Sequence, residues 1–225
     1  MKNFDQLPSE FQNDWVKEYY DILSRKTSAI VLKRLFDIVV ASVMLVFLII
    51  PIGVIALVVK LDSKGPVMFR QERVTTYGKK FRIFKFRTMV VNAEQLGSMV
   101  TTDSDSRITK AGKTLRRYRL DELPQIFNVL AGSMSFVGTR PEVTKYVKLY
   151  RPEYYATLLL PAGITSLASI AFKDEDKLLA ADGDTDAVYV EKVLPEKMKY
   201  NLRYTKEFGL LTDIKLMFKT VKEVF

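Results

Sequence analysis

The stretch IVVASVMLVFLIIPIGVIALVV, from Ile38 to Val59, is the longest uncharged run in this chain. It carries no charged residue, and Ser42 is its one polar side chain. At 1.5 Å per residue, an unbroken helix of this length spans roughly 33 Å, enough to cross the apolar core of a bilayer. The stretch is too long, and too far into the chain, for a cleavable signal peptide. It therefore predicts a helix that enters a membrane.

Basic residues flank this apolar segment on both sides. They are Lys33 and Arg34 before it, and Lys60, Lys64, Arg70 and Arg73 after it. Because positive flanks stay on the cytoplasmic side, a straight span cannot satisfy both ends. Pro51 lacks a backbone donor and clashes with the preceding turn. We therefore expect a kinked, re-entrant helix that breaks at Pro51, with a single span and a buried soluble helix as the alternatives.

The residue types that are missing restrict the chemistry. The chain has neither Cys nor His, which excludes thiolate nucleophiles, Ser-His-Asp relays and Cys/His zinc sites. A metal would need oxygen ligands, most simply as Mg²⁺. The 35 Lys and Arg exceed the 26 Asp and Glu, which favours anionic partners: phosphates, nucleic acid or an acidic lipid surface.

The remaining pattern predicts a mostly helical α+β domain with a short β-hairpin. We divide the chain into an amphipathic lead-in (1–28), the membrane helix-break-helix (29–60) and a cytosolic catalytic domain (61–225). The hairpin strands are expected at residues 67–71 and 80–88.

The lead-in carries apolar residues at helical spacing. They are Phe11, Trp15, Tyr19 and Ile22. Such a helix either lies on the membrane interface or packs against the catalytic domain. The residues alone leave both alternatives open.

Three arginines stand directly before Asp121 and Glu122: Arg116, Arg117 and Arg119. The apolar spacing that follows predicts a helix capped by Asp121 and ended by Gly132. A helix N-terminus with neighbouring guanidinium groups attracts phosphate and keeps carboxylates ionised. An ionised Asp121 beside a bound phosphate is a candidate nucleophile. The alternative is an ordinary capped helix start with arginines on a solvated face.

Two further basic residues are candidates for holding phosphate. Arg140 lies in the loop from Gly138 to Pro141, and Lys85 lies in the basic-aromatic run from Phe81 to Arg87. A basic strand that alternates with Phe is also typical of a half-buried hairpin. We do not expect this strand to bind nucleic acid.

Several motifs together resemble those of the bacterial sugar transferases, the monotopic phosphoglycosyl transferases that initiate glycoconjugate assembly. The motifs are KRLFD (33–37), GPV (65–67), FRQ (69–71), FKFRTM (84–89), LDELPQIFNVL (120–130), GSMSFVG (132–138) and RP (140–141). The resemblance extends from about Lys33 to the C-terminus and leaves out the residues before about Ala29.

The resemblance implies a two-step reaction at the cytoplasmic face of the bacterial inner membrane. Asp121 would attack the sugar-bearing phosphate of a UDP-sugar, release UMP and form an aspartyl phosphosugar. Polyprenyl (undecaprenyl) phosphate would then take the sugar phosphate, which initiates glycan or exopolysaccharide assembly. The resemblance also implies a re-entrant helix kinked at Pro51.

The resemblance assigns roles to individual side chains. Glu122 is associated with Mg²⁺, with Asp121 as a second ligand. The implied phosphate or nucleotide contacts are Lys85, Arg116, Arg140 and Pro141. The sugar, the pathway and the oligomeric state are not determined.

The chain departs from the family pattern in two places. It has Gly138-Thr139-Arg140-Pro141 for the common Gly-Pro-Arg-Pro, and Pro161 to Ser166 for Arg-Pro-Gly-Ile-Thr-Gly. The second departure removes an Arg, and the charged segment from Lys173 to Asp176 has no assigned contact. A different class of protein, a membrane-anchored basic scaffold or binding protein without catalysis, is the rival hypothesis.

Overall fold

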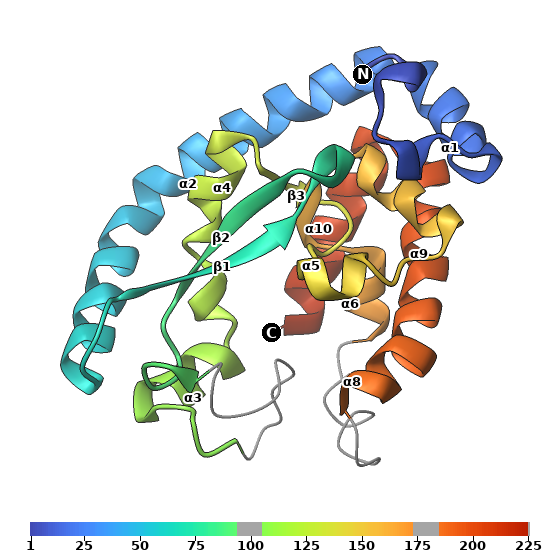
Figure 1. Cartoon of the computed structure of the whole chain (residues 1–225). Coiled ribbons are helices and arrows are strands. Elements are labelled where there is room, and N and C mark those ends of the chain that lie inside the picture. Colours follow the sequence, from blue (N-terminus) through green and yellow to red (C-terminus); the bar gives the residue numbers. More distant parts are fainter. Residues whose placement is uncertain (94–104, 173–184, 225) are drawn as a thin grey trace.

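The computed structural model describes residues 1–93, 105–172 and 185–224. A long helix forms an arc along one side of the molecule, and shorter helices and two small sheets lie beside it (Figure 1). The helices are α1 (Asp14–Ser24), α2 (Thr27–Asp62), α3 (Lys110–Arg117), α4 (Gln125–Ala131), α5 (Thr144–Val147), α6 (Leu167–Ala171), α8 (Thr185–Val188), α9 (Leu194–Glu207) and α10 (Leu210–Val224). The strands are β1 (Met68–Val74), β2 (Lys80–Phe86), β3 (Met134–Val137) and β4 (Ala162–Thr165).

Helix α2 contains the whole apolar segment and continues through Pro51. The predicted break at Pro51 is therefore wrong for the backbone, and Figure 1 shows one curved helix in its place. A proline removes one helical hydrogen bond, and a helix can bend around that loss without ending. By length and composition, α2 is able to cross a membrane.

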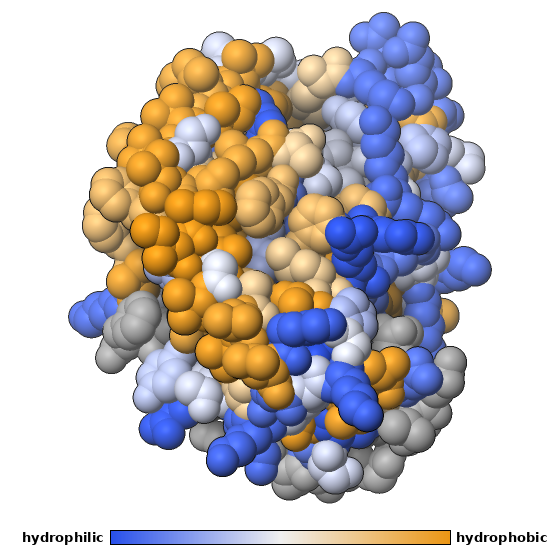
Figure 2. Space-filling view, turned by 90° about the vertical axis from the view of Figure 1, so that its left-hand side faces the viewer, coloured by the Kyte–Doolittle hydropathy of each residue, from blue (hydrophilic) through white to orange (hydrophobic). Residues whose placement is uncertain are grey.

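Most of α2 is not covered by the rest of the protein. The most apolar 18-residue window of α2 has only 11% of its residues buried. Figure 2 shows the result as an apolar ridge over this face of the molecule. Large apolar side chains exposed along α2 are Val31, Leu32, Leu35, Ile38, Val39, Val43, Met44, Val46, Phe47, Ile49, Ile50, Val54, Leu57, Val58 and Leu61. An uncovered apolar surface of this extent is typical of contact with lipid.

The lead-in packs against the C-terminal part of the chain, as in the second of the two alternatives. Helix α1 contacts the 3-10 segment Pro152–Leu159 and α9. Its buried residues are Val16, Tyr19 and Leu23, and Phe11 just before it is also buried. Trp15, from the predicted apolar face, is 61% exposed and lies outside this packing. Periodicity identified the helix but not the face that its neighbours cover.

Two pairs of strands are found in the described residues. Strands β1 and β2 form the predicted antiparallel hairpin, with Met68 opposite Phe86. Strands β3 and β4 are parallel, and their backbones pass very closely. A Cβ on Gly163 would lie 2.1 Å from the backbone nitrogen of Gly138, so this crossing requires glycine. The paired strands β3 and β4 fix the position of the loop that follows β3.

Asp121 does not cap a helix, contrary to the prediction. It lies in a short 3-10 turn, Leu120–Glu122, that follows Arg119 in a left-handed conformation (φ 55°). Helix α4 begins only after Pro124, and it ends at Gly132 (φ 82°) as predicted. The alternative of an ordinary helix start capped by Asp121 is therefore also wrong.

Candidate functional site

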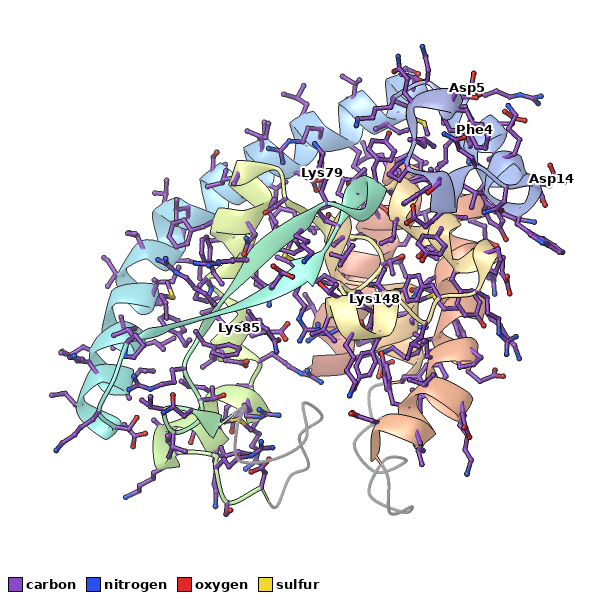
Figure 3. All side chains as sticks on the ribbon, viewed as in Figure 1. Phe4, Asp5, Asp14, Lys79, Lys85 and Lys148 are labelled. Carbon is purple, nitrogen blue, oxygen red and sulfur yellow. The ribbon has the colours of Figure 1, made fainter. Side chains whose placement is uncertain are left out.

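Two cationic side chains from separate parts of the chain, Lys85 and Arg140, form ion pairs with Glu122. The Nζ of Lys85 lies 2.7 Å from Oε1 of Glu122, and Nη2 of Arg140 lies 2.6 Å from the same oxygen. Lys85 comes from β2, away from the hairpin turn that Lys79 marks (Figure 3), and Arg140 comes from the loop after β3. The structure thus brings together three of the predicted site residues.

The two cations keep Glu122 ionised. Burial alone would raise the pKa of Glu122, but the charges of Arg140 and Lys85 outweigh it and hold this pKa well below its usual value. The pKa of Arg140 is raised, with Glu122 as the main cause. Burial lowers the pKa of Lys85, and the Glu122 carboxylate offsets part of that effect. Glu122 is therefore an ionised carboxylate held between two cationic side chains, Lys85 and Arg140.

Asp121 has the opposite character. It is 7% exposed, and no hydrogen bond or ion pair within the described part of the chain involves its carboxylate. Burial raises its pKa and the charge of Glu122 adds to this, while Lys85, Arg116 and Arg140 lower it. A buried carboxylate without bonds to other side chains retains its lone pairs for reaction with an electrophile.

The other two predicted contacts have different surroundings. Arg116, near the end of α3, lies close enough for its charge to lower the pKa of Asp121. Pro141 is buried, and its carbonyl accepts a hydrogen bond from Nη1 of Arg73 at 3.1 Å. Arg73 therefore fastens the loop that carries Arg140, a role that the sequence analysis did not assign to it.

Asn128 is a second residue that the sequence analysis missed. Its side chain lies in α4 and is 3% exposed. It accepts a hydrogen bond from the backbone N–H of Phe84 (2.9 Å) and donates one to the carbonyl of Arg82 (2.9 Å). It therefore holds β2, and Lys85 with it, beside the turn that carries Asp121. An Asn between apolar residues of a helix, here Phe127 and Val129, is the signal that points to such a role.

The described residues contain no group of three or more Asp, Glu, His or Cys side chains able to hold a metal by themselves. The carboxylate that remains free for a cation is that of Asp121, because Glu122 already accepts from Lys85 and Arg140. A divalent ion fits here as Mg²⁺ usually binds, with one or two carboxylates and with substrate phosphates and water as the other ligands.

The two departures from the family pattern lie beside each other. The carbonyl of Thr139 accepts a hydrogen bond from the N–H of Gly163 at 2.9 Å, and Thr139 is buried. Ser166, the last residue of the second departure, caps α6 by accepting from Ser169. The segment from Lys173 to Asp176 lies outside the described residues.

Known proteins are similar in sequence to this chain over most of its length. One relative is UDP-N-acetylgalactosamine-undecaprenyl-phosphate N-acetylgalactosaminephosphotransferase of Aeromonas hydrophila, 38% identical over 75% of this chain and 38% of its own length. A second is UDP-glucose:undecaprenyl-phosphate glucose-1-phosphate transferase of Klebsiella pneumoniae, 40% identical over 87% of this chain and 40% of its own. A third, with the same name, is from Caulobacter vibrioides, 35% identical over 84% of this chain and 68% of its own.

The chain spans about two fifths of the length of the first two relatives. The family model for bacterial sugar transferases matches residues 28–225, which include α2, the hairpin and the turn with Asp121 and Glu122. Because this match covers nearly the whole chain, the protein belongs to the bacterial sugar transferase family.

Proposed function

We propose that this protein is a phosphoglycosyl transferase that moves a sugar 1-phosphate from a UDP-sugar to polyprenyl phosphate, most simply undecaprenyl phosphate. One observation carries the proposal: a buried Asp121 carboxylate without bonding partners lies beside Glu122, which two cations hold. Relatives of the chain carry names that specify UDP-glucose and undecaprenyl phosphate. The product would initiate glycan or exopolysaccharide assembly.

The first step is a displacement at phosphorus. A carboxylate oxygen of Asp121 attacks the phosphorus that bears the sugar, and an Asp121–O–P bond forms. The anhydride bond to the nucleotide breaks, and its electron pair leaves on UMP. Lys85 and Arg140 are placed to hold the phosphate oxygens, because both already converge on an anionic group.

The second step regenerates the enzyme. A phosphate oxygen of the polyprenyl acceptor attacks the same phosphorus and breaks its bond to Asp121. The product is a polyprenyl diphosphate sugar, and Asp121 is again a free carboxylate. A covalent intermediate lets one small site serve a soluble donor and a lipid acceptor in turn.

We infer that the reaction uses Mg²⁺, held by Asp121 and substrate phosphates. Glu122 would be a further ligand once Lys85 or Arg140 moves from it to the substrate phosphates. The ion would supply positive charge that offsets the charge on the leaving UMP. We expect excess EDTA to lower UMP release by at least about 100-fold, because single electrostatic contacts in such sites are worth factors of this size. Restoration by added Mg²⁺ is the control, and full activity in EDTA would contradict the inference.

The function is tested with membranes that contain the protein. A panel of UDP-sugars is supplied with Mg²⁺ and undecaprenyl phosphate, and UMP release and lipid-linked sugar are measured. We expect at least one UDP-sugar to yield both products in equal amounts. The rival hypothesis, a membrane-anchored scaffold, predicts no UMP with any donor.

We also propose that α2 enters and leaves the bilayer on one side, with the catalytic domain at the cytoplasmic face of the inner membrane. Contacts at both ends of α2 support this. Before α2, Glu18 pairs with Lys206 at 2.7 Å, and Nζ of Lys26 donates to the carbonyl of Phe208 at 2.9 Å. Near its end, Arg87 donates to the carbonyls of Val59 (3.2 Å) and Ser63 (2.7 Å).

These contacts connect both ends of α2 to the same domain. A straight helix of 36 residues is roughly 54 Å long and would place its two ends on opposite sides of a bilayer. The domain cannot lie on both sides at once. A curved α2 that dips into one leaflet satisfies both sets of contacts and leaves its apolar ridge in lipid.

Cysteine labelling tests this topology, because the native chain has no Cys. Ser24 and Lys148 are exposed, on either side of α2 in the sequence. We expect Ser24→Cys and Lys148→Cys both to resist a membrane-impermeant thiol reagent on intact cells and both to react after lysis. Labelling of Ser24→Cys alone from outside would show a true span.

A further inference from the structure

A buried network of charges joins the start of α2 to the catalytic domain. Lys33 of α2 forms an ion pair with Asp213 of α10, and its Nζ lies 3.9 Å from Oδ1 of Asp37. These three side chains are 4%, 1% and 2% exposed, respectively. The hydroxyl of Tyr204 donates to Asp213 at 2.8 Å. Buried charges are costly unless paired, so such a network holds its elements in one arrangement.

The network lies at the boundary between the domain and the apolar ridge. Lys33 and Asp37 point into the protein, whereas Val31, Leu32 and Leu35 on the same turns are 65%, 52% and 57% exposed. The start of α2 therefore has one face on the domain and the other on the surface that we assign to lipid. The network thus lies where the folded domain meets this apolar surface.

The same network leads to the candidate active site. The Tyr204 hydroxyl lies 3.3 Å from the carbonyl of Val137, the last residue of β3, and the backbone N–H of Phe136 lies 3.5 Å from Oδ1 of Asp37. Strand β3 continues directly into the loop with Arg140, which binds Glu122.

The neighbouring Arg34 makes a second connection. It donates to the carbonyls of Val129 (2.6 Å) and Leu130 (2.9 Å), near the end of α4. Helix α4 follows the turn that carries Asp121 and Glu122. Both elements that position the site are thus bonded to the first turns of α2.

We propose that the Lys33–Asp213 ion pair sets the depth of Asp121 relative to the lipid surface, so that Lys33 and Asp213 are positioning residues for the lipid-phosphate acceptor. This inference rests on the proposed function. The soluble UDP-sugar reaches Asp121 from water and does not depend on this depth. The phosphate of polyprenyl phosphate is confined to the headgroup layer, so it reacts only when Asp121 lies at that level.

The sharpest variant is Asp213→Asn. It removes the ion pair between α2 and α10, leaves Lys33 with Asp37, and retains an oxygen that accepts from Tyr204. The amount of UMP released in one turnover without acceptor measures the first step. Turnover with undecaprenyl phosphate in lipid nanodiscs measures the second step at a fixed depth. Turnover in detergent micelles measures the second step without a bilayer to define depth.

For Asp213→Asn we expect the UMP burst to stay within about twofold of the wild type, while acceptor turnover in nanodiscs falls by about 10- to 100-fold, since small displacements of reacting groups have effects of this size. In micelles the variant should regain most of the wild-type turnover. Tyr204→Phe, which cuts the link to Val137 and changes little volume, should show a smaller loss in the same step. Asp21→Asn, which removes the exposed Lys17–Asp21 pair, is the matched control.

Equal losses in the burst, in nanodiscs and in micelles would overturn the inference and indicate a purely structural role. Unchanged acceptor turnover of both variants in nanodiscs would overturn it as well. Failure of the wild-type protein to release UMP from any UDP-sugar is a separate result that rejects the proposed function itself.

Discussion

Asp121→Asn is expected to lower turnover by at least about 1,000-fold, because an amide does not form the acyl phosphate and loss of a nucleophile has effects of this order. The protein should remain folded and membrane-bound. Asp121 makes no hydrogen bond or ion pair in the described residues, so the substitution breaks no contact of the folded chain. Burial raises the pKa of Asp121, which means that its charged form is disfavoured in the folded protein. Replacing it with a neutral Asn should therefore leave the free energy of unfolding unchanged or slightly higher.

Two measurements check this expectation. Incubation with radiolabelled UDP-sugar should label wild-type protein and leave Asp121→Asn unlabelled, and the melting temperatures of the two should agree. Asp21→Asn provides an exposed Asp-to-Asn control that should retain full turnover. Near-normal turnover of purified Asp121→Asn would reject Asp121 as the nucleophile, whatever the reaction.

Arg140→Gln is expected to reduce kcat/KM for the UDP-sugar by about 100- to 1,000-fold, the range for losing a preorganised contact to developing charge. Arg140 presents two nitrogens to Glu122, at 2.6 and 3.5 Å, and this fork is also suited to two phosphate oxygens. Arg140→Lys should recover only part of the loss, because an ammonium group restores charge without the fork. Arg203→Gln, at an exposed Arg–Glu pair, is the control that should behave as wild type.

The same variant has a pH signature with a defined sign. The pKa of Glu122 is held well below its ordinary value, so the stability from its pairing is present above the ordinary carboxylate range and is lost as pH falls through the depressed value. Without Arg140 that pKa rises. Because less stability from this pairing remains to be lost, the acid-induced fall in melting temperature should be smaller in Arg140→Gln than in the wild type. Identical acid profiles would show that Arg140 does not hold Glu122 ionised.

The local pattern predicted several elements correctly. An uncharged apolar stretch predicted the long helix α2, and the alternation around Tyr77-Gly78 predicted the hairpin β1–β2. Gly132 marked the end of α4, because glycine readily takes the left-handed conformation found there. The motif with Asp121 and Glu122 coincides with the cluster of charged side chains that we propose as the site. Each of these signals lies within a few residues of the structure that it predicts.

Other predictions failed where neighbours distant in the sequence decide. Spacing grouped Trp15 with Tyr19 on one apolar face of α1, but the face that packs on the segment at residues 152–159 contains Val16, Tyr19 and Leu23. Pro51 was expected to break α2, yet the helix continues through it. Periodicity reports that a face is apolar, but it does not report which other element lies against it.

The amino-acid composition alone limits the chemistry available to this protein: without Cys or His, it is left to Asp, Glu, Lys, Arg, Tyr, Ser and Thr. The sequence also indicated that a long apolar helix precedes the motif with Asp121 and Glu122. How these parts meet depends on the three-dimensional fold. Glu122 binds Lys85 from 37 residues away and Arg140 from 18, and Lys33 binds Asp213 from 180 residues away. Ion pairs act over a few ångströms in space, so partners this far apart in the chain are determined by the fold that brings them together.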